Sequence, residues 1–532
     1  MRINRRDFLY TATAAGALSF VRLGAQEALD GRKVFLHGVA SGDPLADKVI
    51  LWTRVTSREN AAPEVSWELS TDPEFRRLAS RGTVATGAAR DFTVKIDAGM
   101  LQPATTYYYR FMALGERSPA GRTRTLPARG VERIRLALAS CSNLPFGYFN
   151  VYRRIAARPD LDAVLHLGDY LYEYPNARYG DGTATGRIPE PDREIVTLAD
   201  YRLRHAQYKR DPDLQEVHRQ HPFIVVWDDH EFANNTWRDG AENHNTDIGE
   251  GEWTARRAAA VQAYVEWMPI REDRATRRVR IYRTFSFGDL ADLVMLDTRL
   301  VDRDRQAISR DEVGVLDDPA RTLLGSAQEA WLAGELKSSG RAAVTWQLLG
   351  QQVMFAPGSQ PGQPAVSTDT WDGYRPARDR VLDAIDAGGL RNVVVLTGDV
   401  HSSWAYDVPR RPWSEYNSET GAGTAAVEIV VPAVTSATGF GDAGQAARRI
   451  ERLKAERPHL KWVEGLHRGY VVLDVTRERV QADWFGVPTV TERTDEETRL
   501  KSLLSAAGDP HLLEAEGAAS PGTSPPPAPR GA

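Results

Sequence analysis

The fold is decided by a stretch at residues 163–173, AVLHLGDYLYE. Its mostly apolar part, 163–167, passes directly into Gly168 and Asp169, as is typical of a buried strand that ends in a turn. Similar apolar runs recur at 134–139, 223–227, 293–296 and 393–397. Stretches with helical periodicity lie around them, at 148–157, 198–219, 255–268, 327–337 and 378–386. This alternation predicts a layered α/β domain in which both faces of the sheet are covered.

Residues with chemically active side chains follow each of these predicted strands. They are Cys141, then Asp169, then Asp228, Asp229 and His230, then Asp297 and Arg299, and finally Asp399 and His401. A single Asp at such a place indicates only a turn, but ligands bind at the carboxyl ends of strands in open α/β sheets. Carboxylates suit hard cations, imidazoles suit transition metals and thiolates suit softer ones. The mixture favours a multinuclear metal site, which is well suited to hydrolysing phosphate esters.

The N-terminal part has a different pattern. Residues 33–127 contain short apolar and aromatic runs at 49–52, 65–69, 92–96 and 107–111, separated by turn residues. This pattern predicts a small antiparallel β-sandwich. The run 105–109, TTYYY, resembles a strand of a fibronectin type III domain.

Composition and charge argue against nucleic-acid binding and rule out an intramolecular disulfide. The chain has 532 residues, and 67 basic against 72 acidic residues leave a formal charge of −5. That balance argues against a general nucleic-acid-binding surface, which is basic. Cys141 is the single cysteine, so an intramolecular disulfide is impossible.

Both ends of the sequence carry separate signals. Residues 1–27 contain Arg5-Arg6 before the apolar run 8–20, which looks like a twin-arginine export signal. No later stretch has the roughly 18 apolar residues of a transmembrane helix, so a periplasmic or secreted protein without a membrane anchor is expected. Residues 491–516 are interpreted as a helical extension and 517–532, rich in Pro, Gly, Ser and Ala, as a disordered tail.

Three motifs at the strand ends carry a family resemblance. GDYLYE at 168–173 is similar to the GDxxD motif of calcineurin-like metallophosphoesterases, DDHE at 228–231 stands in the place of GNHE, and GDVH at 398–401 in that of GHxH. The departures are those of the PhoD-type alkaline phosphatases, which read GDYxYE, WDDHE and GDVHSS. Further matches lie at 37–44, 51–54, 296–299 and 467–470, so the resemblance covers about residues 1–490.

The resemblance implies a fold and a domain order. A four-layer αββα metallophosphoesterase domain, 132–490, is expected after the small fibronectin-like β-sandwich at 33–127. The four layers are implied by the family and not by periodicity.

The resemblance also implies a ferric ion. Cys141, Asp169, Tyr172 and His401 look like its ligands. Cys141 stands where other metallophosphoesterases begin with a DxH motif, which is absent here, and Tyr172 occupies the second acidic position of GDxxD. Outside this motif, Tyr172 would be interpreted as a packed aromatic residue. Asp169 is expected to bridge to a second metal.

The second implied metal is calcium, with Asp229 and Asp399 as ligands. Asn143, Asn234, Asn235 and Gln351 carry amides nearby in the motifs, and the relation of these amides to the second metal is left open. Asp228 is interpreted as an orienting partner of His230 or of a ligand. Asp297 and Arg299 could form a structural ion pair. Equally, they could contact the phosphate of the substrate or the side chains that bind the metals.

His230, beside Asp229, is expected to protonate the leaving alkoxide or to stabilise the phosphoryl group; a satisfied core imidazole is the alternative. His37, His166, Trp227 and Trp404 are interpreted as structural.

The reaction implied by the resemblance is hydrolysis of phosphate esters through attack of a metal-bound hydroxide on phosphorus. Two alternatives stay open. One is a phospholipase D-like phosphodiesterase activity in the same site, because the width of the pocket cannot be read from sequence. The other is a non-catalytic cell-envelope module that binds a partner through its β-sandwich and keeps metal for stability. The large number of convergent ligands argues against this second alternative. The expected partners are a phosphate ester substrate and the twin-arginine export machinery.

Overall fold

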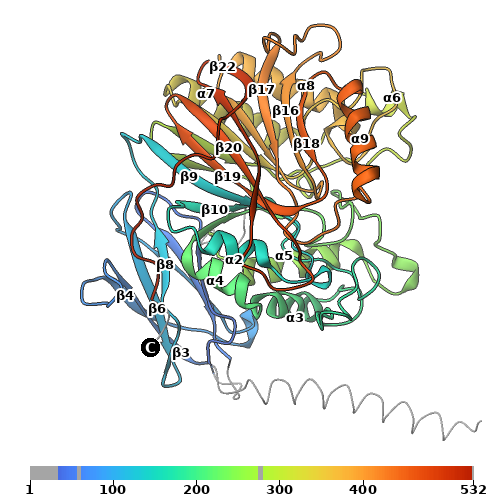
Figure 1. Ribbon diagram of the computed structural model, residues 1–532. Coiled ribbons are helices and arrows are strands. Elements are labelled where there is room, and N and C mark those ends of the chain that lie inside the picture. Colours follow the sequence, from blue (N-terminus) through green and yellow to red (C-terminus); the bar gives the residue numbers. More distant parts are fainter. Residues whose placement is uncertain (1–33, 57–61, 273–279, 530–532) are drawn as a thin grey trace, which may run out of the picture.

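The computed structural model describes residues 34–56, 62–272 and 280–529 (Figure 1). The predicted signal at 1–27 lies outside these residues. Within the described part of the chain, no helix combines the length and the apolarity that a bilayer-spanning segment needs.

Two large sheets form the centre of the molecule. The ten-stranded sheet has the order β22 (Asp509–Glu514), β21 (Thr498–Ala506), β20 (Arg479–Val487), β19 (Arg468–Thr476), β9 (Arg133–Ala139), β10 (Ala163–His166), β11 (Pro222–Val225), β1 (Val39–Gly42), β2 (Val49–Arg54) and β5 (Thr93–Ala98). The seven-stranded sheet has the order β12 (Arg283–Phe287), β13 (Ala291–Met295), β14 (Trp346–Gln351), β15 (Val393–Thr397), β17 (Thr424–Val430), β16 (Ser403–Pro409) and β18 (Leu460–Glu464). Strands β9, β10, β11 and β1 are parallel, as are β13, β14, β15 and β17, so their carboxyl ends share one edge in each sheet.

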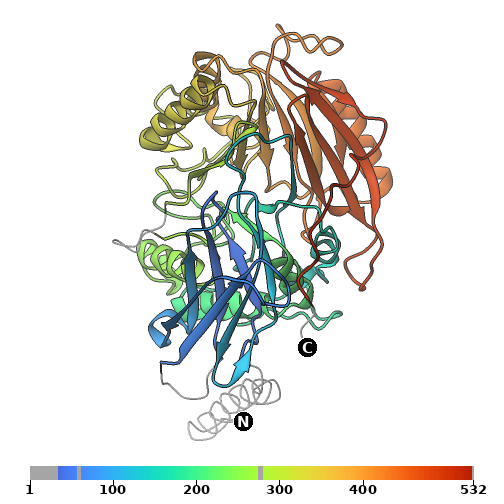
Figure 2. The same ribbon diagram turned by 90° about the vertical axis from the view of Figure 1, so that its left-hand side faces the viewer.

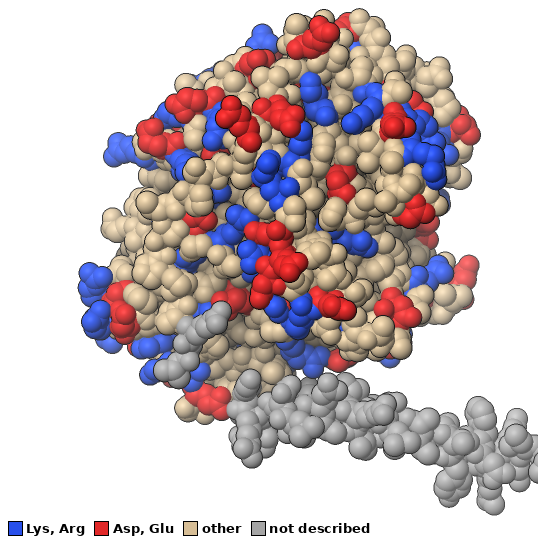
Figure 3. All heavy atoms as spheres, viewed as in Figure 1, with Lys and Arg blue, Asp and Glu red and all other residues tan. Residues whose placement is uncertain are grey.

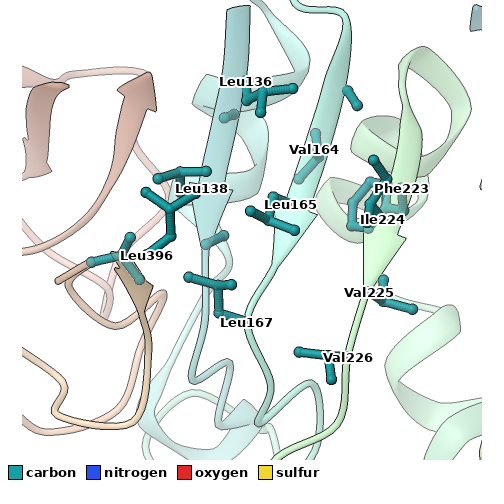
Figure 4. Packing of buried hydrophobic residues seen from close by; sticks show 14 of the residues in the cluster. Leu136, Leu138, Val164, Leu165, Leu167, Phe223, Ile224, Val225, Val226 and Leu396 are labelled. Carbon is teal, nitrogen blue, oxygen red and sulfur yellow. The ribbon is translucent and has the colours of Figure 1, made fainter. Parts of the chain in front are cut away.

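The two sheets pack face to face through apolar side chains. Leu138 of β9, Leu167 after β10 and Leu396 of β15 belong to one buried cluster that draws on both sheets (Figure 4). Gly350 of β14 leaves room for Met295 of β13, because a Cβ atom there would lie 2.6 Å from Met295 Sδ. Burial of this interface is the main apolar contribution to the stability of the fold.

Helices surround the pair of sheets. They are α2 (Asn150–Ala156), α3 (Leu198–Lys209), α4 (Pro212–Gln220), α5 (Trp253–Trp267), α6 (Val313–Leu316), α7 (Gly325–Arg341), α8 (Arg375–Ala387) and α9 (Ala443–Glu456). The helices α2, α3, α4 and α5 lie together on the ten-stranded side, and α7 and α8 contact strands of the seven-stranded sheet (Figures 1 and 2). The chain is therefore a mixed α/β protein, as the alternation of patterns predicts.

The stretch 198–219, predicted as one helix, forms two helices. Asp211 caps the start of α4 by accepting hydrogen bonds from the backbone N–H groups of Asp213 and Leu214, and Pro212 occupies the first turn. Proline disfavours helical conformation in the residue before it, so α3 ends and α4 starts anew.

The strands predicted within 33–127 form, but they divide between two sheets. β1, β2 and β5 belong to the ten-stranded sheet. The rest form a five-stranded sheet of β4 (Leu78–Ala85), β3 (Glu64–Ser70), β6 (Thr106–Ala113), β7 (Glu116–Arg117) and β8 (Gly121–Arg124). Val49, Leu51, Val65 and Tyr109 join both groups in one core. The N-terminal part thus shares a sheet with the remainder of the chain.

The predicted helical extension at 491–516 is wrong. Residues Thr498–Ala506 and Asp509–Glu514 form β21 and β22, which pair as an antiparallel hairpin and extend the ten-stranded sheet beyond β20. Ala507 and Gly508 make the turn, and Gly508 has a φ of 85°, which glycine adopts without the penalty that other residues pay.

The predicted disorder of 517–532 is wrong for residues 517–529, which we call the C-terminal strap. Arg219 donates to the carbonyls of Ala528 and Pro529 at 3.1 and 3.0 Å, and Tyr108 donates to the carbonyl of Pro526 at 2.7 Å. At the other end Asp483 accepts from the N–H of Ala519 at 2.9 Å. The strap therefore joins the ten-stranded sheet to α4 and to the five-stranded sheet.

Candidate metal centre

The strand ends place the predicted residues in strained backbone conformations. Cys141, Asp169, Asp399 and His401 all have positive φ, between 56° and 62°. Such conformations are costly for residues other than glycine and gather at functional sites. The turns direct these side chains to the edge where strands of both sheets end.

Gly168 makes the close approach of two of these turns possible. Its φ is 103°, and a Cβ atom at this position would lie 2.4 Å from Asp228 Cβ. The absence of a side chain therefore lets the turn after β10 contact the turn after β11.

The first cluster of ligand atoms consists of Cys141, Asp169 and His401, whose ligand atoms lie within 4.8 Å of one another. Tyr172 joins it: its hydroxyl donates to Asp169 Oδ2 at 3.0 Å and lies 3.2 Å from His401 Nε2. Burial raises the pKa of both Cys141 and Tyr172 well above the usual values, and the charge of Asp169 raises them further. Both groups therefore keep their protons unless a strong cation is present.

The second cluster consists of the carboxylates of Asp228, Asp229 and Asp399. Burial raises the pKa of Asp399 to about 8, opposed by Arg299, and burial likewise raises the pKa of Asp228 well above its usual range. Asp228 Oδ2 is buried and has no hydrogen-bond partner among the described residues. An acidic cluster with an unpartnered buried oxygen fits a hard cation.

Arg299 balances part of this negative charge. The buried guanidinium contacts Asp228 through Nε, donates to Asp399 Oδ1 at 3.0 Å and binds both oxygens of Asp369 at 2.8 and 2.9 Å. Asp297 uses its Oδ1 to accept the N–H groups of Arg299 and Leu300. The predicted side-chain ion pair between Asp297 and Arg299 does not form, because Asp297 caps the turn that carries Arg299.

A third group of ligand atoms joins the other two. It consists of Asp169, Asp229 and His230, so Asp169 is shared with the first cluster and Asp229 with the second. His230 Nδ1 lies 2.7 Å from Glu173 Oε2. Although burial lowers the pKa of His230, the charges of Asp229, Glu173 and Asp169 outweigh burial and raise it well above the usual value. His230 is thus an oriented imidazole with a raised pKa at the junction of the clusters.

The predicted amides differ in their positions. Asn143 donates to the carbonyl of Tyr179 at 3.0 Å, and its buried Oδ1 has no partner within the described ranges. Asn235 contacts Asp229 only through its backbone N–H, at 2.6 Å, and Asn234 contacts Glu173 in the same way, at 2.7 Å. Gln351 uses both ends of its amide on Thr397 and Trp371. The buried amide oxygen of Asn143 is thus available for a ligand.

The residues interpreted as structural are buried, as expected. These are His37, His166, Trp227 and Trp404. His37 packs edge-on against Trp267, and His166 contacts the hydroxyl of Tyr152 at 2.8 Å.

Two residues of the site were not predicted as functional. Glu173 ends the GDYLYE motif, so its position directly after Tyr172 was an available signal. Asp369 lies in a loop between β14 and α8 and follows no strand end, so its contact with Arg299 could not be inferred from sequence.

The fold and the clusters define a mixed α/β protein with three overlapping groups of potential metal ligands at the ends of its strands. A family profile described as "PhoD-like phosphatase" matches residues 136–484, and one described as "PhoD-like phosphatase, N-terminal domain" matches residues 22–127. The chain belongs to the PhoD-like phosphatases, a family of phosphate ester hydrolases.

Two relatives agree with this assignment. Alkaline phosphatase D of Bacillus subtilis (strain 168) is 39% identical over 476 residues, which cover 86% of this chain and 78% of the relative. A solved structure described as "Structure of PhoD" is 37% identical, with a TM-score of 0.81 over 91% of this chain and 92% of that one.

Proposed function

We propose that this chain hydrolyses phosphate esters at a centre of one ferric ion and calcium. Cys141, Asp169, Tyr172 and His401 would hold the ferric ion, and Asp229 and Asp399 would hold calcium. The observation that carries the proposal is the shared position of Asp169, which lies in two clusters of ligand atoms at once. A carboxylate shared in this way is suited to bridge two cations and screen their mutual repulsion.

The donor types support the division between the two metals. A buried thiol and a buried phenol both have raised pKa values and lie beside Asp169. A trivalent cation would strongly favour the anionic forms of the thiol and the phenol. The all-carboxylate cluster of Asp228, Asp229 and Asp399 offers the oxygen ligands that calcium takes.

When bound, the two metals supply an activated water and positive charge for the phosphate oxygens. The chain's own residues perform the remaining steps. The water oxygen forms a bond to phosphorus and gives up one proton to the solvent while the ester P–O bond breaks. The leaving alkoxide takes a proton from His230 to become the alcohol, and the solvent then reprotonates His230. Glu173 orients His230 through Nδ1, and Arg299 holds Asp228 and Asp399 in place.

We also infer that the layering is the four-layer αββα arrangement of metallophosphoesterases. The face-to-face sheets and the helices on their outer sides support it. The five-stranded sheet, packed against β1, β2 and β5, corresponds to the fibronectin-like β-sandwich.

A phosphatase assay with and without a chelator tests the proposal. Nitrophenyl phosphate should be hydrolysed, and chelation should abolish turnover until metal is restored. Hydrolysis of a diester such as bis-nitrophenyl phosphate distinguishes phosphodiesterase activity, phospholipase D-like activity included, from a strict monoesterase. No turnover of either ester by metal-loaded protein would favour the non-catalytic, metal-stabilised envelope module.

Export is a separate part of the proposal, supported by Arg5-Arg6 and the apolar run that follows. The receptor of the twin-arginine route reads the arginine pair and not its charge alone. Changing Arg5-Arg6 to Lys-Lys should therefore retain the precursor in the cytoplasm, and undiminished export would assign the segment to the ordinary secretory route.

A further inference from the structure

A hollow of about 380 Å³ opens directly beside the first cluster of ligand atoms. His401 lines it and is also one of the proposed ferric ligands, so the hollow is continuous with the reacting centre. The hollow is also lined by Tyr179, Trp404, Ala437, Phe440 and Arg449. Nothing in the proposed chemistry requires this space, and a volume of this size is at the lower end of sites for small organic molecules.

One wall of the hollow is flat and apolar. The rings of Trp404 and Phe440 pack edge to face with their centroids 5.7 Å apart, and both are buried. Phe440 is held there by Gly465: a Cβ atom on Gly465 would lie 2.1 Å from Phe440 Cγ, so the ring lies on bare backbone. The wall is therefore fixed in position before any ligand arrives.

Tyr179, which also lines the hollow, connects it to the proposed catalytic groups. The ring of Tyr179 stacks on His401 at 6.2 Å and on His230 at 6.3 Å, with interplanar angles of 26° and 13°. Its hydroxyl lies 3.1 Å from His401 Nδ1. A group that occupies the hollow thus shares a wall with His230, the proposed proton donor to the leaving oxygen.

The rim is formed by Arg449 of α9, an exposed residue. Its guanidinium lies over the ring of Phe440 at 4.3 Å and donates to the carbonyl of Gly439 at 2.8 Å. Basic and acidic side chains are interspersed where α9 lies on the face shown in Figure 3. A planar cation above an aromatic ring adds a third flat surface, on which another ring can stack.

We propose that this hollow binds the alcohol portion of the substrate and favours aryl and arylalkyl phosphate esters over small alkyl esters. The inference rests on the proposed function, because it identifies the hollow with the leaving-group side of that reaction. Aromatic walls on two sides and a guanidinium at the rim favour a flat ring, since ring faces gain from offset or edge-to-face contacts. Small alkyl groups leave most of these surfaces in contact with water.

The test compares two phosphonates that cannot be hydrolysed, benzylphosphonate and methylphosphonate, by calorimetric titration of the metal-loaded full chain. Turnover of benzyl phosphate and ethyl phosphate is measured alongside, because both release alkoxides of similar basicity. We expect benzylphosphonate to bind at least ~10-fold more tightly than methylphosphonate, with a similar ratio of kcat/KM between the esters.

Three variants change the hollow without replacing a proposed ligand, and Ala437→Leu keeps the backbone carbonyl that lies 3.0 Å from His401 Nδ1. Ala437→Leu fills it, Phe440→Ala removes one wall and Arg449→Ala removes the rim. Each should reduce the benzyl-to-methyl ratio, and Ala437→Leu should bring it close to unity. Arg449→Ala, at an exposed position, keeps the test valid if Phe440→Ala fails to fold. The matched control is Arg448→Gln, because Arg448 is exposed on α9 beside Arg449 and does not line the hollow.

The outcomes are distinct. Equal binding of the two phosphonates by the wild type, or a ratio unchanged in all three variants, would overturn the leaving-group pocket even if both esters are hydrolysed. A preference for benzylphosphonate that the variants remove, without turnover of either ester, would support the pocket and reject the proposed function.

Discussion

His230 Nδ1 lies 2.7 Å from Glu173 Oε2, and both side chains are buried. The other carboxylate oxygen of Glu173 accepts the backbone N–H of Asn234 at 2.7 Å and the amide of Asn243 at 2.9 Å. Glu173 is thus fixed from two sides, and it holds the imidazole of His230 within the group of ligand atoms that includes Asp169 and Asp229. This is the arrangement expected of an oriented general acid.

Glu173→Gln should weaken catalysis without removing metal. Loss of this negative charge lowers the raised pKa of His230, so a smaller fraction of His230 stays protonated as pH rises. The alkaline limb of the pH–rate profile should move to lower pH, and turnover of alkyl phosphates should fall about 10-fold or more. Glu242→Gln is the control, because Glu242 is exposed and contacts Asn234 and Asn235 instead of His230. An unmoved pH profile would remove Glu173 from the mechanism.

Cys141 and Tyr172 should give the ferric form a visible charge-transfer band. Cys141→Ala should weaken or abolish the thiolate part of that band, and Tyr172→Phe the phenolate part. Absorption spectra and metal analysis of the purified protein check this prediction. Colourless wild-type protein with stoichiometric zinc and no iron would contradict the assignment.

The site was more predictable than the C-terminal part of the chain. Cys141, Asp169 and Asp229 follow neighbouring parallel strands of one sheet, so their convergence follows from periodicity and topology. Asp399 follows β15 of the other sheet, so its approach depends on how the two sheets pack. The same reasoning cannot find Asp369, whose loop position depends on tertiary contacts with Arg299 and Arg303.

The C-terminal errors have a physical cause. The composition of the strap favours disorder, but Arg219, Tyr108 and Asp483, distant in sequence, supply partners for its backbone. Similarly, backbone pairing with β20 makes residues 498–506 a strand, and pairing with that strand makes 509–514 another.

The strap should contribute measurably to stability. A chain that ends at Glu516 removes the strap hydrogen bonds of Asp483, Arg219 and Tyr108, although Asp483 keeps Gln481 and Arg219 keeps Glu216. Each lost hydrogen bond contributes about 1 kcal/mol. We expect a loss of about 3 kcal/mol in the free energy of unfolding, measured by chemical denaturation. Removal of 530–532 alone is the control. Equal stability of the two truncated chains would show that the strap contacts contribute nothing.

Buried neutral histidines should make the fold sensitive to acid. Burial lowers the pKa of His205 from 6.5 to about 3, with a further contribution from Lys209. Between these values the unfolded chain binds a proton that the folded chain excludes. The stabilising contribution is therefore complete above pH 6.5 and is lost as pH falls toward 3.

His205→Phe keeps an aromatic ring beside Trp267 and removes this titration. At pH 5 the variant should lose about 2 kcal/mol less stability, relative to pH 7.5, than the wild type. Denaturant unfolding at both pH values measures the difference, with His467→Gln as a control at a half-exposed position. An identical loss in wild type and His205→Phe would mean that His205 is not excluded from protonation in the fold.

The central claim is that Asp169 bridges two metals while His230 acts on the substrate and binds neither. Metal content, together with turnover of an alkyl phosphate, should be measured in Asp169→Asn and His230→Ala. Asp169→Asn should lose both metal and activity, because two cations remain without the shared carboxylate. His230→Ala should keep its metal and lose activity by roughly 10²–10⁴-fold, the scale of a missing acid–base group. Full metal content in Asp169→Asn, or loss of metal from His230→Ala, would contradict the account.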